Sequence, residues 1–62
     1  MKELERIKAT LKANNIKTRV TKYGLYIYTK YTTFFIAKFD LELKGKDSKK
    51  YNDYIVETAI NL

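Results

Sequence analysis

The chain of 62 residues contains no cysteine, no histidine and no proline, and it has only two glycines. Without cysteine, no disulfide braces so small a domain, and without cysteine and histidine the usual structural zinc site is excluded. The same absences remove the commonest general base and the strongest nucleophile of enzymes. A mean hydropathy of −0.47 and the lack of a long apolar run predict no membrane span. We therefore expect one small non-catalytic domain over residues 1–62, without a metal or cofactor.

Positive charge is what the chain has in abundance. Lys and Arg number 13 against seven Asp and Glu, which gives a net charge of +6, and 11 of the cations are lysine. Lysine, tyrosine, isoleucine and asparagine have A/T-rich codons, so the composition indicates an A/T-rich genome, such as that of a low-GC bacterium or its phages. Codon bias does not exchange glutamate for lysine, so the net charge still predicts an anionic partner. The N-terminus leads into a helix without an apolar signal region, so we expect a bacterial cytoplasmic protein, encoded by the host or by a phage.

Hydrophobic periodicity predicts an α-β-β-β-α order of elements. Apolar residues three and four apart predict an amphipathic helix over residues 2–13, ended by Asn14 and Asn15. Alternation predicts strands over residues 16–21, 25–30 and 34–43, with a first turn at Tyr23 and Gly24. A final helix, capped by Asp47 or Ser48, presents an apolar stripe. The stripe consists of Tyr51, Tyr54, Ile55, Thr58, Ala59 and Leu62. We expect an α+β domain in which a three-stranded antiparallel sheet carries both helices on one face.

The connection between the second and third strands decides which side chains share a face. On the second strand, Leu25 and Ile27 are better core residues than Tyr26 and Tyr28. On the third strand, the odd positions are the more apolar set: Phe35, Ala37, Phe39, Leu41 and Leu43. If the odd positions of both strands face the core, the loop around Tyr31-Thr32-Thr33 must have three or five residues. A two-residue loop would invert the faces of one strand. We therefore predict an odd loop.

With that register, the sheet face opposite the helices carries cations, rings and no acid. The residues of this predicted platform are Lys17, Arg19, Tyr26, Tyr28, Lys30, Phe34, Ile36 and Lys38. Tyr26 and Tyr28 are expected about 6.6 Å apart, which is twice the strand rise. Bases stack on such rings while lysine and arginine hold phosphates, so the pattern predicts a surface for single-stranded nucleic acid. Tyr and Lys are also ordinary on a solvated sheet face, but Phe34 and Ile36 favour a partner there.

A second basic cluster surrounds the start of the last helix and consists of Lys44, Lys46, Lys49 and Lys50. Lysine opposes the helix dipole there, and the free backbone amides suit a phosphate or another anion. The alternative is a solvated loop with Asp47 and Asp53 as counter-charges. The element order resembles that of the double-stranded RNA-binding domain, in which lysines that open the second helix meet phosphates. The chain lacks the longer first hairpin loop and the histidine-bearing motif of that family.

Three hypotheses of function follow from these features. The first is a non-catalytic protein that binds nucleic acid through the predicted platform with little or no sequence preference. The second is a phage or mobile-element inhibitor or adaptor that docks on a host protein of nucleic-acid metabolism or defence, for instance an anti-CRISPR inhibitor of a nuclease. The third is a structural homodimer packed through the same face. Asp40 and Glu42 share a predicted strand face, but a carboxylate pair without a third ligand or a pocket does not support a magnesium site.

Overall fold

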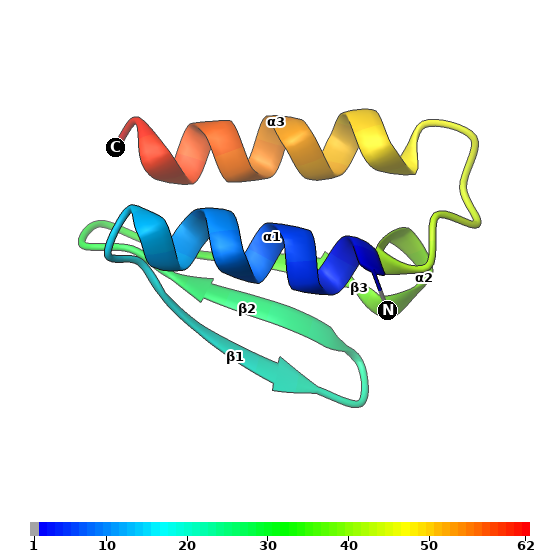
Figure 1. Cartoon of the computed structure of the whole chain (residues 1–62), viewed down its shortest axis with the longest axis horizontal. Coiled ribbons are helices and arrows are strands. Elements are labelled where there is room, and N and C mark those ends of the chain that lie inside the picture. Colours follow the sequence, from blue (N-terminus) through cyan, green and yellow to red (C-terminus); the bar gives the residue numbers. More distant parts are fainter. Residues whose placement is uncertain (1) are drawn as a thin grey trace.

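The computed structural model describes residues 2–62. The elements in chain order are helix α1 (Lys2–Ala13), strands β1 (Lys17–Thr21), β2 (Gly24–Tyr28) and β3 (Thr33–Ala37), a short helix α2 (Lys38–Leu41) and helix α3 (Ser48–Ile60). The strands form one antiparallel sheet in the order β1-β2-β3. Helices α1 and α3 lie side by side on one face of the sheet, and the described chain places no element on the other face (Figure 1). The predicted α+β class is confirmed, and α2 is an addition to the predicted order.

Helix α1 matches its prediction at both ends. It begins at Lys2 and ends at Ala13, and Asn15 follows with a left-handed φ of 61°. Asparagine tolerates that conformation, which is why the chain leaves the helix here and enters β1. Ile7 and Leu11 are fully buried, as the apolar spacing predicts, and Leu4 is half-buried. Met1 is a further apolar residue at this spacing and lies outside the described residues.

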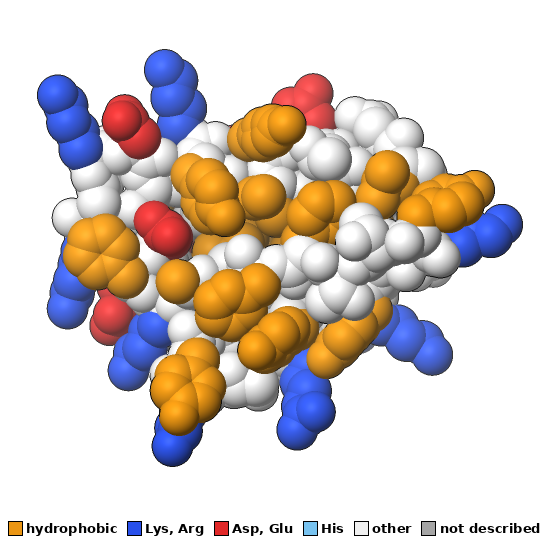
Figure 2. Space-filling model, turned by 180° about the vertical axis from the view of Figure 1, so that it is seen from behind, with side chains coloured by type: hydrophobic (Ala, Val, Ile, Leu, Met, Phe, Trp, Pro, Cys, Tyr) orange, Lys and Arg blue, Asp and Glu red, His pale blue; other side chains and the backbone are white. Residues whose placement is uncertain are grey.

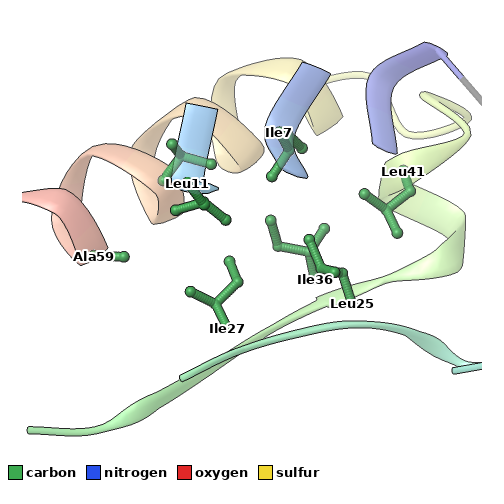
Figure 3. Packing of buried hydrophobic residues seen from close by; sticks show 8 residues of the cluster. Ile7, Leu11, Leu25, Ile27, Ile36, Leu41 and Ala59 are labelled. Atoms are coloured by element: carbon green, nitrogen blue, oxygen red, sulfur yellow. The ribbon is translucent and has the colours of Figure 1, made fainter. Parts of the chain in front are cut away.

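The hydrophobic core fills the space between the helices and the sheet (Figure 3). The side chains of Ile7 and Leu11 point down from α1, and those of Leu25, Ile27 and Ile36 point up from β2 and β3. All five are fully buried. Leu41, Val56 and Ala59 close the core from α2 and α3. A fully buried Leu or Ile contributes roughly 1.5–3 kcal/mol, so this small cluster supplies much of the stability of the fold.

The β2–β3 connection is even-numbered, so the predicted odd loop is wrong. Leu25 pairs with Ile36 and Ile27 pairs with Phe34, which joins odd positions to even ones. Thr29 and Thr32 continue the ladder, because the Thr29 N–H donates to the Thr32 carbonyl (2.9 Å) and the Thr29 hydroxyl donates to the same oxygen (2.6 Å). The Thr32 N–H in turn donates to the Thr29 hydroxyl (3.0 Å). Threonine hydroxyls thus close a tight hairpin without glycine or asparagine.

The predicted third strand, residues 34–43, is wrong beyond Ala37. The Lys38 N–H donates to the carbonyl of Tyr23, the residue before β2 (2.8 Å), and the chain then turns into α2. One helical turn carries Leu41 into the core, whereas the predicted core residues Phe39 and Leu43 are exposed. Leu43 adopts a left-handed φ of 55° as the chain leaves the turn. The alternation of Phe39, Leu41 and Leu43 resembles a strand pattern, but only Leu41 serves the core.

The buried face of α3 also differs from the predicted stripe. Its buried residues are Ser48, Asn52, Val56 and Ala59, and the predicted core residues Tyr51, Tyr54 and Leu62 are exposed. Neither Asp47 nor Ser48 caps the helix with its side chain. The Ser48 hydroxyl instead accepts the Gly45 N–H (3.0 Å) and donates to Asp40 Oδ1 (2.8 Å), which ties the α2–α3 loop together.

No helix among residues 2–62 combines the length and apolarity that a bilayer crossing requires.

Candidate functional site

The sheet face that the helices leave uncovered, here called the open face, is built from paired positions on the three strands. Side chains at paired positions of antiparallel strands lie on the same face. Because Leu25 and Ile27 point into the core, their neighbours on β2 point the other way. The two rows of the open face are Lys17–Tyr28–Thr33 and Arg19–Tyr26–Phe35. Each row therefore begins with a cation on β1 and continues with an aromatic ring on β2.

Three aromatic rings form a contiguous cluster on the open face. The ring centres of Tyr26 and Tyr28 lie 6.4 Å apart with an angle of 13° between their planes, close to the spacing that the strand rise predicts. The Tyr26 and Phe35 centres lie 4.8 Å apart at 49°. Tyr28 keeps 40% of its surface exposed and Phe35 keeps 37%, while Tyr26 between them is half-buried. The outer two rings are therefore available to a ligand, and the central ring supports both.

Gly24 makes room for the Phe35 ring beside this cluster. A side-chain carbon at residue 24 would lie 2.9 Å from Phe35 Cζ and would overlap the Ile36 carbonyl oxygen. Gly24 also adopts a φ of +152°, which residues with a side chain avoid. A glycine is thus required where β2 begins, both for the hairpin and for the ring that lies over it.

Four of the eight residues in the predicted platform come together on the open face: Lys17, Arg19, Tyr26 and Tyr28. The placement of Phe34 and Ile36 there is wrong, because the even β2–β3 register turns both toward the helices. Ile36 is fully buried, and Phe34 packs against the core. Phe35, which the sequence assigned to the core, lies on the open face in their place. The even number of residues in the β2–β3 loop decides which of these side chains face outward.

The remaining two residues of the predicted platform lie at opposite ends of the sheet. Lys30 occupies the tip of the β2–β3 hairpin, and its Nζ lies 5.7 Å from the centre of the Tyr31 ring. Lys38 is the first residue of α2, immediately after β3. Both are exposed, and they extend the positive charge of the open face beyond its two rows.

The charges of the chain are divided unevenly. Eight of the 13 cations and none of the seven acids lie between Arg6 and Phe39, the segment that includes the whole sheet. In residues 2–62, ion pairs engage Arg6, Lys44 and Lys49, and none engages Lys17 or Arg19. The cations on β1 are therefore uncompensated by nearby carboxylates, and their charge is available to an anionic ligand.

A groove of about 600 Å³ runs between α1 and β1, next to the open face. Lys8 and Lys12 of α1 line one wall, Lys17 of β1 lines the other, and Ala9 and Ile16 contribute apolar surface. Lys17 belongs to both the groove and the open face. Lys8 and Lys12 are not part of the predicted platform, because their proximity to β1 is set only by how α1 crosses the sheet. The groove extends the basic surface around the β1 edge.

The second basic cluster contains its own counter-charges. Lys44 Nζ lies 3.8 Å from Glu42 Oε1, and Lys49 Nζ lies 3.0 Å from Asp53 Oδ2. Two of the four lysines are therefore paired locally, and surface pairs of this kind contribute little to stability. The anion site predicted at Lys44, Lys46, Lys49 and Lys50 stays a prediction.

A polar network on the other side of the molecule joins α1 to α3. The Arg6 guanidinium donates to both oxygens of Glu3 (2.8 and 2.9 Å) and to Asp53 Oδ1 (2.8 Å). The fully buried Asn52 amide donates to Glu3 Oε2 (3.0 Å) and to the Asp40 carbonyl (3.0 Å). Hydrogen bonding from Arg6 holds the pKa of Glu3 below its ordinary value, and Lys49 followed by Arg6 does the same to the pKa of Asp53. These contacts hold α1, α2 and α3 together, so their role is structural.

The carboxylates Asp40 and Glu42 do not share a strand face, because the chain has left the sheet before them. Asp40 lies in α2 and accepts the Ser48 hydroxyl, and Glu42 follows α2 and pairs with Lys44. Across residues 2–62, no three His, Cys, Asp or Glu side chains gather in a way that could hold a metal ion.

Comparison of the chain with protein-family models, curated proteins and solved structures found no match. The resemblance to the double-stranded RNA-binding domain therefore rests on the order of elements alone.

Proposed function

We propose that the protein binds single-stranded nucleic acid on the open face, with little preference for sequence and without catalysis. Tyr28 and Phe35 stack with bases, Tyr26 supports them, and Lys17 and Arg19 hold the backbone phosphates. The observation that carries the proposal is the combination of three contiguous rings with two unpaired cations on an acid-free, uncovered sheet face. Aromatic platforms flanked by basic residues bind single strands in this way because every base has a π-face.

The spacing of the rings supports a strand over a duplex. The 6.4 Å between the Tyr26 and Tyr28 centres is close to twice the ~3.4 Å rise per nucleotide of a stacked strand. Bases within a duplex are already stacked on each other and cannot lie on a flat sheet face. We therefore expect single strands to bind more tightly than duplexes of the same sequence.

The position of the cations supports a path for the phosphates. Lys17 and Arg19 stand at the β1 end of both rows, and the groove with Lys8 and Lys12 lies directly beyond them. A strand whose bases lie on the rings can run its backbone along β1, in reach of these four cations. The net charge of +6 assists the encounter at low salt.

Fluorescence anisotropy with labelled single-stranded DNA and RNA of about 12 nucleotides, and with the matching duplex, tests the proposal. The key variant is Tyr28→Ala, and its matched control is Tyr54→Ala, which removes a ring that is 60% exposed on α3, away from the open face. Loss of one stacking ring costs ~1–3 kcal/mol, so Tyr28→Ala weakens binding by roughly 5- to 150-fold and Tyr54→Ala leaves it unchanged. Circular dichroism of both variants controls for folding.

A salt series separates phosphate contacts from other contacts. For a single strand, the slope of log K against log salt is about −0.7 per phosphate neutralised, so Lys17→Gln reduces the slope by about 0.7. Lys50→Gln, in the second basic cluster, is the control and leaves the slope unchanged. The proposal is wrong if no nucleic acid binds at low salt, or if Tyr28→Ala and Lys17→Gln behave as their controls do.

The same measurements distinguish nucleic-acid binding from docking on a protein of nucleic-acid metabolism or defence. That alternative drew its strength from the predicted exposure of Phe34 and Ile36. Ile36 is fully buried and Phe34 packs partly buried against the core, which removes the main support of that alternative. A protein interface centred on Phe35 and Tyr28 has a weak salt dependence and depends on one central ring. If nucleic acid does not bind and a nuclease is instead inhibited in a Tyr28-dependent manner, the open face is a protein-docking surface.

A further inference from the structure

The outer edge of β3 carries backbone groups that the fold leaves unpaired. Thr29–Thr32 and Tyr23–Lys38 are hydrogen-bonded pairs at the two ends of the β2–β3 ladder. Because such pairs alternate along an antiparallel ladder, Phe34 and Ile36 direct their backbone groups at β2, and Thr33, Phe35 and Ala37 direct theirs away. No other described hydrogen bond of residues 2–62 uses the N–H of these three residues.

The two edges of the sheet differ in how they are protected. Natural proteins blunt exposed edge strands with charge, proline or bulges. Strand β1 carries Lys17 and Arg19, and Lys22 follows it. Strand β3 has the sequence Thr-Phe-Phe-Ile-Ala, without charge or proline, and it pairs with β2 in continuous register. In a chain with 13 cations, none lies within β3, and the nearest is Lys38, the first residue of α2.

The flank of α3 above this edge is also uncharged. Asp53 contacts Arg6 of α1, so the side of α3 opposite to Asp53 faces outward over β3. The residues of that side are Tyr51, Ile55, Thr58 and Leu62, with Tyr51 and Leu62 exposed. Seen from the side away from α1, hydrophobic side chains gather over the middle of the molecule and Lys and Arg project around the rim (Figure 2).

We propose that a second copy of this chain pairs with the β3 edge, so that two sheets join into one sheet of six strands. The pairing is antiparallel about a two-fold axis at Phe35. The Phe35 N–H of each copy donates to the Phe35 carbonyl of the other. The Ala37 N–H of each copy donates to the Thr33 carbonyl of the other. An isologous interface requires such self-complementarity. The absence of charge from the five residues of β3 explains why two copies of charge +6 can approach there.

The size of the contact is compatible with a weak dimer. Helix α3 with its 13 residues is about 20 Å long, and the helix and sheet layers together are roughly 15 Å deep. Each face is therefore about 300 Å² in projection, and two such faces bury well under roughly 1,200 Å² of accessible surface, which is the range of weak, transient interfaces. The open faces of the two copies then form one surface with both Phe35 rings at its centre and the β1 cations at its outer ends.

Ala37→Pro tests the edge without disturbing the fold. Ala37 already has a φ of −66°, the value that proline imposes, so the change removes an outward N–H and little else. Phe35→Lys adds the stronger test, because it opposes two charges at the axis. Val20→Lys on β1, where the side chain is 45% exposed, is its control. Thermal melts followed by circular dichroism verify that each variant folds.

Sedimentation velocity and light scattering of the free protein supply the readout. We expect twice the mass of 7.4 kDa for the native chain and for Val20→Lys, and the monomer mass for Phe35→Lys. Ala37→Pro removes two hydrogen bonds per dimer and raises the dissociation constant about 10- to 100-fold. A native monomer at high micromolar concentration overturns the proposal. The proposal is also overturned if Tyr28→Ala disrupts the dimer and Ala37→Pro does not, because such a dimer uses the open face.

The outcome is independent of nucleic-acid binding. Dimerisation is measured without a ligand and depends on Ala37, whereas binding is measured by Tyr28 and Lys17. A monomer that still binds single strands refutes only the dimer, and a dimer that binds none refutes only the proposed function.

Discussion

Replacing Gly24 with alanine gives the sharpest test of how the open face is built. The added carbon would overlap the Ile36 carbonyl oxygen and would lie 3.0 Å from Ala37 Cα. Both are backbone atoms of β3, so relief requires the two strands to separate. The φ of +152° adds strain that an alanine does not tolerate.

The cost of this substitution can be worked from its parts. Backbone strain at such a φ costs about 1–3 kcal/mol, and one or two weakened ladder bonds cost about 1 kcal/mol each. A domain of 62 residues has a free energy of unfolding of roughly 3–9 kcal/mol. The expected loss of about 2–5 kcal/mol is therefore a large share of the stability. At ~1 kcal/mol per molar urea, the unfolding midpoint falls by about 2–5 M.

Urea unfolding followed by far-ultraviolet circular dichroism measures this effect. A Gly24→Ala, Phe35→Ala double variant is the matched control, because it removes the ring that lies 2.9 Å from the new carbon and leaves the backbone overlap. We expect no rescue. A midpoint for Gly24→Ala within about 0.5 M of the native value would refute the reasoning, and full rescue by Phe35→Ala would assign the clash to the ring instead.

Three further predictions concern stability. The pKa of Glu3 lies below its ordinary value of 4.5. The ionised carboxylate therefore stabilises the fold fully above pH 4.5, and this stabilisation is lost as the pH falls through the lowered pKa. Thermal melts should show a melting temperature that falls with acid, and Glu3→Gln should reduce that fall. Ile36→Ala empties a fully buried site and should cost ~2–5 kcal/mol in urea unfolding, whereas an exposed Ile36 would cost little. Asn52→Ala leaves the buried Glu3 carboxylate short of a donor and should cost ~1–3 kcal/mol, with no change in nucleic-acid affinity.

The elements that sequence predicts well are those whose pattern is local. Ile7 and Leu11 lie one helical turn apart, and Leu25 alternates with Tyr26 along β2, so α1 and the two faces of β2 follow from spacing alone. The fold class follows from the order of such elements. Half of the predicted platform lies on one face for the same reason, since Tyr26 and Tyr28 need only the β2 alternation to share a face.

The parts that sequence mispredicted depend on contacts between distant residues. Thr29 and Thr32 close the β2–β3 hairpin with hydroxyl bonds, a route that turn preferences do not reveal, and the resulting parity exchanged Phe34 for Phe35. The buried face of α3 is set by Asn52, whose partner Glu3 lies 49 positions away. Because a polar residue such as Asn52 is ordinarily assigned to the surface, the predicted apolar stripe of α3 was placed on the face with Tyr51 and Tyr54 instead.

The uneven division of charge has a consequence for how a ligand arrives. Residues 6–39 carry a formal charge of +8, and the rest of the chain carries −2. Such a molecule is an electric dipole, and a polyanion that diffuses toward it is turned before contact so that it meets the positively charged strands first. Orientation in the encounter shortens the search for the bound pose. The association rate should then decline with ionic strength even for an anion too short to span the rings.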